Sequence, residues 1–510
     1  MKTQSIAFAL CLFAMSATAN CDNVLPFPRA YTSLGGFAKA PEVVEDRDAS
    51  LPPEGYRLEV RQDGARITAA DDRGAFYARE TLRQLTGADG RVPCCRVSDH
   101  PTYPFRSMMI DEGRHFFGKA FVLKTLELMA KYKYNKLHWH LTEDQGWRIA
   151  IDRYPELTKI GATRLETAVR GRFTGKYDGT RYGPYFYTKD DIREIVRRAT
   201  ELRIDIIPEI EMPGHCRSVI AAYPELACPT AKLGRRTCWT DFGICNDVVC
   251  AANPKVLEFY RNVIDEVCEL FPGEYIHTGG DEVTGVQWRA CPLCTAKAKE
   301  LGFTDIMKLQ GWFTMQIYEY IVNVKHRKMT GYCSILENGT KLDPRNMYLS
   351  GGCDNSHVFS AMHGYPTVVS PLEYMYWDFN QGLDDADKVL YATWWPGAIT
   401  LSSVYGFDPR RGIYGDARKN VLGGEAHNWS EYSYSVKELE WKMWPRGIAL
   451  AQALWNPQGG YSFKERFLPS VKRHIAALRA EGVNCAGAYE GYSCATTGGR
   501  STENQELKLD

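Results

Sequence analysis

The chain has 510 residues, 44% of them hydrophobic and 24% charged, so it can bury a large core and is long enough for two or three domains. Lysine plus arginine equals aspartate plus glutamate at 62 each, and this balance argues against nucleic acid or an anionic membrane as a partner. The composition therefore predicts a soluble, folded protein.

The first 19 residues have the pattern of a secretory signal peptide. A positively charged start precedes a short apolar run over 6–15, and Ala17-Thr18-Ala19 fits the small-x-small cleavage pattern. That run is too short to span a bilayer, and no other segment predicts a transmembrane helix. The residues directly before Cys21 do not fit the sequence that precedes a lipid-modified cysteine, so no lipid anchor is expected there. We expect an exported protein, periplasmic or secreted, that loses residues 1–19.

Sixteen cysteines are present, fifteen of them after the expected signal peptide, so at least one has no intramolecular disulfide partner. In an oxidising compartment, Cys228, Cys238, Cys245 and Cys250 are expected to form disulfides that staple loops. The motif Cys291-Pro-Leu-Cys294 could form a local disulfide, a redox pair or half of a zinc site. Because no second CxxC motif is present, we expect no bound zinc.

Residues 20–100 are expected to form a small α+β domain. Alternating apolar residues predict strands at 56–60 and 65–69, and a helical pattern follows over 74–85. Two prolines, Pro101 and Pro104, mark the boundary with the rest of the chain.

Beyond that boundary the pattern changes to alternating strands and helices. Apolar runs predict eight strands, at 107–111, 136–141, 204–210, 275–278, 328–332, 347–350, 367–370 and 421–426. Helical stretches between them include 119–131, 189–202, 254–270 and 305–324. Eight strands with crossover helices match a (β/α)8 TIM barrel, although a doubly wound open sheet gives the same alternation.

The ends of the predicted strands favour the barrel. Nearly every strand ends in histidine, carboxylate, arginine or aromatic groups, and a barrel gathers such ends at one site. We assign residues 101–484 to this domain, which closes near Trp455 and is covered by a helix at 462–481. Residues 485–510 are expected to be a polar tail.

The most informative strand end is YIHTGGDEV, residues 275–283. Its two glycines permit a sharp turn, after which Asp281 and Glu282 can face one pocket. Two close carboxylates in different environments can share the general-acid and charge-stabilising roles of glycosidic bond cleavage. A solvated turn without a function has the same composition.

Further candidate groups end the first three barrel strands. Arg114 can donate forked hydrogen bonds to vicinal hydroxyls or to a neighbouring carboxylate. His138 and His140 share one face of a strand, either as a zinc-ligand pair or, as we favour, as interior histidines bonded to carboxylates. Glu211 stands four residues before His215 and can orient its ring, which could then set the proton affinity of Glu282.

The ends of the last two strands supply groups suited to a sugar. Tyr376 offers a phenol donor, Trp429 an aromatic wall, and Asp378 and Glu431 offer carboxylates for hydroxyl groups.

Together these motifs resemble the β-N-acetylhexosaminidases of glycoside hydrolase family 20. The resemblance runs in order over the small preceding domain, FRSMMIDEGRHFF, YKYNKLHWHLTEDQGWRIAI, PEIEMPGH, HTGGDE, YMYWDF and EAHNWSE. It implies a (β/α)8 catalytic domain that removes terminal N-acetylglucosamine or N-acetylgalactosamine with retention of configuration, by substrate-assisted catalysis. It implies no metal and no cofactor, and a partner that is an oligosaccharide or glycoconjugate ending in N-acetylhexosamine. The oligomeric state stays open.

The resemblance also implies a role for each strand-end group. Asp281 would bind the acetamido N–H and stabilise the oxazolinium-like intermediate, Glu282 would be the general acid and base, and Tyr376 would donate to the acetamido oxygen. The other groups would bind hydroxyls (Arg114, Asp378, Glu431), floor the sugar ring (Trp429) or tune Glu282 (Glu143, His215, Glu211).

The chain departs from the family pattern at several places. Glu143 and Glu211 stand where aspartate is common in the family. The fifth and sixth strands end at Tyr332 and Gly351, where family tryptophans enclose the acetamido methyl. Losing an indole from an apolar slot costs about 3 kcal/mol of binding unless another aromatic, such as the pair Trp394-Trp395, refills it. A wider pocket with altered specificity, such as disaccharide release, and a non-catalytic glycan-binding barrel are therefore the alternatives.

Overall fold

The computed structural model describes residues 21–169, 171, 174–351, 355–382, 392, 397–457 and 462–488. The described residues divide into two compact units, one of 21–24 with 28–100 and one of 25–27 with the described residues from 101 on. The predicted signal peptide lies outside the described residues, as does most of the predicted C-terminal tail. Within the described ranges, every helix is too short or too polar to cross a bilayer.

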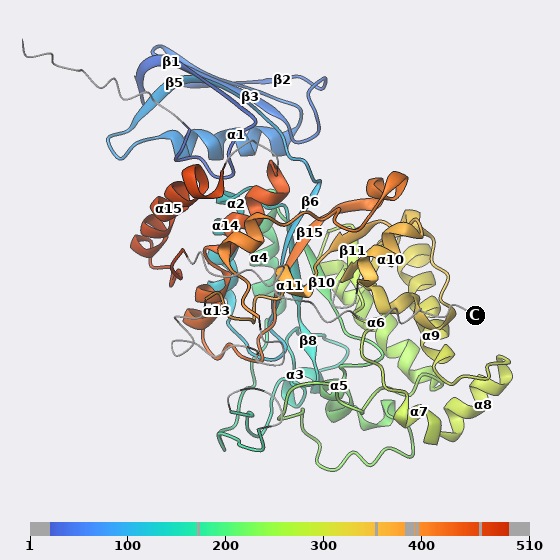
Figure 1. Ribbon diagram of the computed structural model, residues 1–510. Helices are drawn as coiled ribbons and strands as arrows, with labels where there is room; N and C mark the ends of the chain where they lie inside the picture. Colours follow the sequence, from blue (N-terminus) through green and yellow to red (C-terminus); the bar gives the residue numbers. More distant parts are fainter. Residues whose placement is uncertain are drawn as a thin grey trace, which may run out of the picture. The chain divides into compact units, whose positions relative to one another are not determined.

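The first unit is a five-stranded sheet with a helix packed against it (Figure 1). The strand order is β1-β5-β3-β4-β2, and every pair is antiparallel except β2 beside β4. The bounds are β1 Ala30–Lys39, β2 Val43–Arg47, β3 Tyr56–Arg61, β4 Gly64–Ala69, α1 Asp72–Leu85 and β5 Arg91–Asp99. Alternate side chains of β3 and β4 are buried, which is why their pattern predicts strands, whereas β1 and β2 are mostly exposed and carry no such signal.

The second unit is built on eight parallel strands that close into a barrel, which confirms the predicted fold class. Around the barrel the order is β10-β11-β12-β13-β14-β15-β6-β7. The bounds are β6 Phe105–Asp111, β7 Lys136–His140, β10 Asp205–Glu209, β11 Tyr275–His277, β12 Lys328–Tyr332, β13 Met347–Gly351, β14 Thr367–Val369 and β15 Val421–Asn428. Each lies within two residues of a predicted strand, in the predicted chain order.

Helices surround these strands (Figure 1). The longer ones are α2 Lys119–Lys131, α4 Lys189–Glu201, α6 Pro254–Leu270, α8 Pro292–Glu300, α9 Lys308–Glu319, α13 Val436–Met443, α14 Arg446–Trp455 and α15 Leu468–Ala480. Short elements are β8 Thr142–Glu143, β9 Gly146–Trp147, α3 Glu156–Lys159, α5 Arg217–Ala222, η1 Pro224–Leu226, α7 Val286–Ala290, η2 Tyr320–Val324, η3 Cys333–Gly339, η4 Pro344–Asn346, α10 Ser356–Met362, α11 Leu372–Met375, α12 Leu401–Tyr405, η6 Gly415–Asn420 and η7 Phe463–Phe467.

The barrel interior changes from apolar to polar along its axis. Phe105, Ile207, Tyr348 and Val368, at or near the amino ends of their strands, form a buried apolar cluster. Toward the carboxyl ends, buried histidines and glutamates replace the apolar side chains. Because buried charges need partners, this polar layer is built as a network of ion pairs under the mouth of the barrel.

Barrel closure depends on Gly423, and we expect Gly423→Ala to destabilise the protein by about 3 kcal/mol. Gly423 pairs with Phe105 where β15 meets β6, and an added Cβ would lie 1.9 Å from the Phe105 backbone oxygen. That oxygen belongs to the barrel ladder and cannot move cheaply. Urea unfolding of the variant measures the loss. Gly406→Ala is the control, since its Cβ meets nothing nearer than 3.5 Å; equal stabilities for both variants would contradict the argument.

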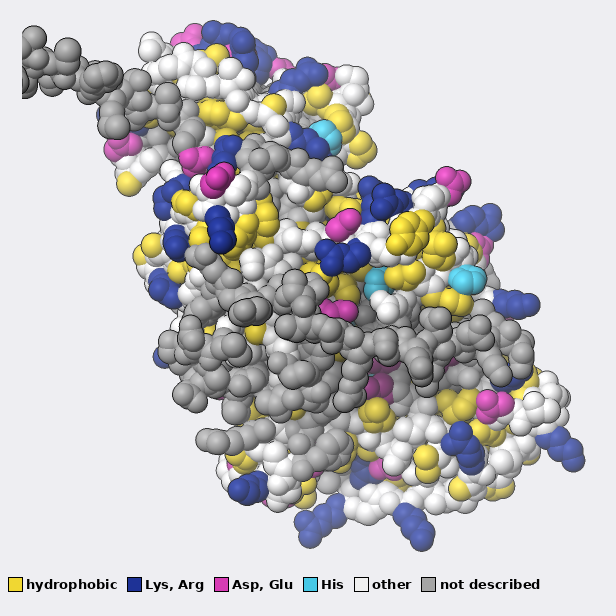
Figure 2. Space-filling view, in the orientation of Figure 1, with side chains coloured by type: hydrophobic (Ala, Val, Ile, Leu, Met, Phe, Trp, Pro, Cys, Tyr) yellow, Lys and Arg dark blue, Asp and Glu magenta, His cyan; other side chains and the backbone are white. Residues whose placement is uncertain are grey.

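The balanced composition has a counterpart on the face shown in Figure 2. Among the described residues there, lysine and arginine side chains are scattered, with acidic side chains between them. Charge on this face is therefore mixed in sign.

Candidate active site

The acidic pair lies on a sharp turn directly after β11. Gly279 has a φ of +58°, and a Cβ there would lie 1.8 Å from Glu211 Oε2. Only glycine fits that space, and Gly280 N–H donates to the same Glu211 oxygen at 3.4 Å. Glu282 itself has a φ of +53°, so the turn holds a non-glycine residue in the left-handed region. This turn presents Asp281 and Glu282 at the carboxyl end of the barrel.

His215 connects Glu282 to the end of β7. Its Nε2 lies 3.3 Å from Glu282 Oε2, and its Nδ1 lies 3.3 Å from both Glu143 Oε1 and Asp144 Oδ2. Burial disfavours the charged ring, but the charge of Glu143 and the close contacts with the three carboxylates outweigh burial and raise the pKa of His215 well above its usual value. The ring therefore carries a positive charge next to Glu282.

The predicted pairing of Glu211 with His215 is wrong. Among the described residues, the ring of His215 forms ion pairs with Glu143, Asp144 and Glu282 but not with Glu211, which faces the Gly279–Gly280 turn. Asp144 is thus a contact that the sequence analysis missed, although it stands directly after Glu143. Burial, followed by the charge of Asp281, raises the pKa of Glu211 well above its ordinary value.

Arg114 extends the same chain of contacts toward β15. Its Nη2 lies 2.7 Å from Glu143 Oε1, and its Nε lies 3.6 Å from Glu431 Oε1. The guanidinium also lies over the Trp429 ring, 5.0 Å from the ring centre. Asp111 connects the loop after β6, which carries Arg114, with the loop after β15, which carries Ser430. It accepts hydrogen bonds from the backbone N–H of Arg114 and, at 2.9 Å, from the Ser430 hydroxyl.

Aromatic rings complete the wall on the β12 and β15 side. Trp429 has ring-centre distances of 6.1 Å to Tyr376 and 6.3 Å to Tyr332. Tyr376 packs against His427 at 5.3 Å, and Tyr332 against His277 at 4.8 Å. Tyr332 therefore lies where the resemblance leads one to expect a tryptophan from the fifth strand, and its ring remains part of the wall.

Several buried polar atoms of this region have no hydrogen-bond partner within the described part of the chain. Asp281 Oδ1, Asp378 Oδ1 and the indole nitrogen of Trp429 are among them. Buried polar groups in proteins are nearly always bonded, so these atoms are suited to bond a ligand's hydroxyl and amide groups. Burial, with the charge of Glu431 in the same direction, raises the pKa of Asp378 to about 7.

The two adjacent acids have different environments. Burial is the main cause that raises the pKa of Asp281 to about 6, with the His215 charge acting against it and the Glu282 charge adding to it. The Glu282 side chain is 43% exposed. Burial acts to raise its pKa too, but the hydrogen bond and charge of His215 prevail and lower it.

The structure brings the predicted site residues to one mouth of the barrel through the contacts above. Gly351, on β13, has a φ of +137°, and the atom nearest to a Cβ there would be Cys333 Sγ at 3.5 Å. Cys333, which begins η3 directly after β12, therefore lies beside the end of β13, where a tryptophan was expected. The pair Trp394-Trp395, considered as a replacement, lies outside the described residues.

The barrel histidines form the carboxylate network that the sequence analysis favoured over a metal pair. His138 Nε2 lies 2.8 Å from Glu209 and its Nδ1 lies 3.0 Å from Glu425, while His140 Nδ1 bonds Glu209 as well. Burial opposes a charge on His138, but Glu425 and Glu209 raise its pKa to about 9. These side chains are close enough to hold a metal ion; His138 Nδ1 is hydrogen-bonded to Glu425, and Nε2 lies at ion-pair distance from Glu209.

Family models and known proteins similar to this chain point to one enzyme family. A model described as the catalytic domain of glycosyl hydrolase family 20 matches residues 103–458, and one described as domain 2 of that family matches residues 23–100. A β-hexosaminidase of Porphyromonas gingivalis is 35% identical over 451 residues, which are 86% of this chain and 55% of that protein. A β-hexosaminidase of Akkermansia muciniphila is 30% identical, with 89% of each chain covered. This chain thus spans little more than half the length of the Porphyromonas relative.

Solved structures show the same likeness. The crystal structure of a family 20 exo-β-N-acetylglucosaminidase from Vibrio harveyi, in complex with N-acetylglucosamine, has a TM-score of 0.79 at 27% identity, over 92% of this chain and 79% of that one. A closed parallel barrel with an acidic pair, an arginine and aromatic rings at its carboxyl end fits a glycoside hydrolase, the class to which the matched family belongs. The catalytic-domain match covers well over half of the residues. The chain belongs to glycoside hydrolase family 20, and the resemblance drawn from its motifs is confirmed.

Proposed function

We propose that this protein is an exported exo-β-N-acetylhexosaminidase that removes terminal N-acetylglucosamine or N-acetylgalactosamine from β-linked glycans. One observation carries the proposal: Asp281 and Glu282 share a barrel mouth with Arg114 and Trp429, joined through His215 and Glu143. Family membership supports hydrolysis of terminal N-acetylhexosamine.

In the first chemical step, the substrate's acetamido oxygen attacks the anomeric carbon and the glycosidic bond breaks. Glu282 donates its proton to the departing oxygen, which leaves as an alcohol. Asp281 accepts a hydrogen bond from the acetamido N–H and stabilises the positive charge of the oxazolinium, while Tyr376 donates to the acetamido oxygen and orients it. With a pKa of about 6, Asp281 is an anion at neutral pH, as this role requires.

In the second step, a water molecule gives a proton to Glu282 and its oxygen bonds the anomeric carbon. The oxazolinium ring opens, the acetamido group is restored and the configuration is retained. The sugar is held by Arg114, Asp378 and Glu431 through its hydroxyls and by Trp429 through its face. The orphaned Oδ1 of Asp378 supports its part in this contact.

The charge of His215 is expected to set the pH range of activity. His215→Gln removes a positive charge that holds down the pKa of both Glu282 and Asp281, so both values rise. The active form needs Asp281 ionised and Glu282 protonated, which is the reverse of the order of their pKa values in the free enzyme, so it is a minor form whose pH range both values bound. When both pKa values rise, the whole pH profile of kcat/KM moves to higher pH. Profiles of the wild type and variant measure the shift. His363→Gln, an exposed histidine, is the control; a His215→Gln profile that overlays the wild type after scaling would reject the assignment.

The domain organisation forms part of the proposal. Residues 1–19 act as a signal peptide removed on export, 20–100 form the small domain, 101–484 the catalytic domain and 485–510 a tail. The small-x-small sequence before Asn20 and the division of contacts after His100 support these limits. Amino-terminal sequencing of the protein recovered from the periplasm or medium tests the cleavage site.

Turnover of paired chromogenic substrates tests the function. We expect hydrolysis of aryl β-N-acetylglucosaminide and none of aryl β-glucoside, because the glucoside lacks the acetamido group that attacks. Turnover of neither substrate, with N-acetylglucosamine still bound, would favour a non-catalytic glycan-binding barrel. A preference for releasing disaccharides from aryl chitobioside would instead indicate the wider pocket.

A further inference from the structure

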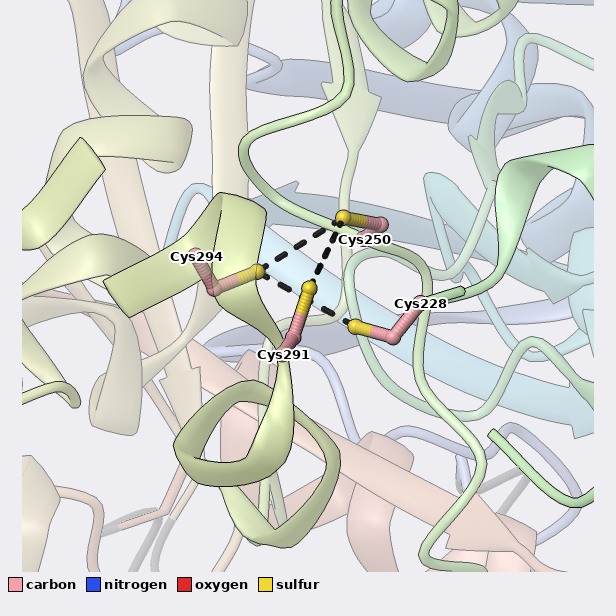
Figure 3. A group of neighbouring side chains, drawn as sticks. All are labelled: Cys228, Cys250, Cys291 and Cys294. Carbon is pink, nitrogen blue, oxygen red and sulfur yellow. Dashed lines mark hydrogen bonds between the residues drawn. The ribbon is translucent and has the colours of Figure 1, made fainter. Parts of the chain in front are cut away.

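Four buried cysteines from three separate segments meet in the second unit (Figure 3). Cys228 follows η1, Cys250 lies in the loop before α6, Cys291 stands between α7 and α8, and Cys294 lies in the first turn of α8. Their four sulfur atoms all lie within 4.8 Å of one another. The predicted disulfide staples among Cys228, Cys238, Cys245 and Cys250 are not formed, since all four are free thiols.

The spacing of these sulfurs suits a tetrahedron around one ion, since three of the distances between them are close to its edge length and all lie within 4.8 Å. The Sγ distances are 3.6 Å for Cys250–Cys294, 3.8 Å for Cys250–Cys291 and 3.9 Å for Cys228–Cys294. Four sulfurs bonded at about 2.3 Å to a tetrahedral zinc ion lie about 3.8 Å apart. Because Cys250 and Cys294 each have two of these neighbours, the sulfurs form one cluster rather than two isolated pairs.

We propose that Cys228, Cys250, Cys291 and Cys294 bind a structural zinc ion as four thiolates. On binding, each thiol that is still protonated releases its proton to solvent, and the ion completes four bonds to sulfur with no open position. All four side chains are buried, so an ion held by them would be shielded from solvent. Cys291 and Cys294 also lie at the amino end of α8, whose dipole favours thiolate.

The proposal departs from the expectation of no zinc, because the fold brings together cysteines that the sequence does not display as a motif. Cys291-Pro-Leu-Cys294 has no second CxxC partner in sequence, but two isolated cysteines, Cys228 and Cys250, complete the set in space. The bridge from Leu226 to Cys250, in which Cys250 N–H donates to the Leu226 oxygen at 2.8 Å, holds these two segments side by side.

The ion would join two loops that carry active-site groups. The turn with Asp281 and Glu282 leads directly through α7 to Cys291, and the segment after His215 leads through α5 to Cys228. Trp288, on α7, already donates from its indole nitrogen to the Val249 oxygen at 2.9 Å, next to Cys250. Zinc therefore stabilises the relative position of Glu282 and His215; this consequence rests on the proposed function, whereas binding of the ion does not.

Metal analysis of the full-length protein, purified with reductant and without chelator, is the direct test. We expect about one zinc per chain, and cobalt exchanged for zinc should show the absorption bands of a tetrahedral tetrathiolate site. Cys250→Ser and Cys294→Ser should each lower the zinc content roughly tenfold or more. Cys268→Ser is the matched control, because its half-buried sulfur is outside the cluster, and it should retain zinc.

Two results would overturn the proposal. One is wild-type protein without zinc that also fails to give the cobalt spectrum. The other is a mass lower by four hydrogens, with peptides joined as Cys228–Cys294 and Cys250–Cys291, which would make the cluster two disulfides. If the serine variants fail to fold, the zinc content and cobalt spectrum of the wild type still decide. Zinc with normal stoichiometry but no hexosaminidase activity would reject the proposed function and leave the metal site standing.

Discussion

Glu282→Gln is expected to lower kcat/KM on oligosaccharide substrates by about 10³-fold while lowering it by only about tenfold on activated aryl glycosides. A sugar leaving group needs the proton that Glu282 supplies, because its alkoxide is a poor leaving group. A nitrophenolate departs with little protonation. The glutamine keeps the shape and the contact with His215 at 3.3 Å but cannot donate an acidic proton. Steady-state kinetics on chitobiose and on an aryl N-acetylglucosaminide measure the two losses.

The control for this variant is Glu319→Gln, an exposed residue at the end of α9, which should leave both rates unchanged. Adding azide offers a second readout, since a small nucleophile can replace the general-base role in the second step but not the acid role in the first. Equal losses on both classes of substrate would contradict the assignment of Glu282 as the acid.

Asp281→Ala is expected to lower kcat by about 10³-fold on every substrate, because the developing positive charge of the oxazolinium loses its nearest carboxylate. The same variant should bind thiazoline mimics of that intermediate much more weakly, whereas affinity for free N-acetylglucosamine should fall much less, because the neutral sugar loses only the hydrogen bond from its acetamido N–H. The attraction between the Asp281 carboxylate and a positive charge contributes only to binding the charged intermediate or its mimic, so only that binding loses it. Competition assays with a thiazoline inhibitor and titration with the sugar provide the two affinities.

Two further variants sharpen this test. Asp281→Asn keeps the size of the side chain without its charge, so it should behave like the alanine variant toward the thiazoline. Asp416→Asn, on the exposed surface of η6, is the control and should behave like the wild type. Thiazoline affinity that survives Asp281→Ala would remove Asp281 from the proposed contact with the acetamido group.

The barrel is predictable because its signals are local. Each strand of the barrel is a short apolar run, and the runs at 107–111 and 421–426 are recognisable even though β6 and β15 pair across more than 300 residues of chain. The turn after β11 is equally local, since two glycines and two acids stand next to one another. Its geometry adds one reason that the sequence does not display: Gly279 is required because Glu211 occupies the space of a side chain.

Side-chain partners are less predictable because they depend on where the loops meet. The spacing of Glu211 and His215 suggested a pair, yet the ring of His215 contacts Glu143 and Asp144 from a different strand end. Strand β1 is another example, since its exposed side chains leave no alternating pattern to detect. In both places, neighbours distant in sequence decide the structure.

The amino-acid sequence by itself determined the eight strands, their order along the chain and the presence of an acidic pair at a strand end, because hydrophobic periodicity and turn chemistry are written within a few adjacent residues. Only the tertiary structure decided which carboxylates surround His215 and which cysteines lie together in one cluster. Cys228 and Cys294 are 66 residues apart, and Cys250 and Cys291 are 41 apart. Contacts of that kind arise when the barrel closes and its loops pack, which no local pattern records.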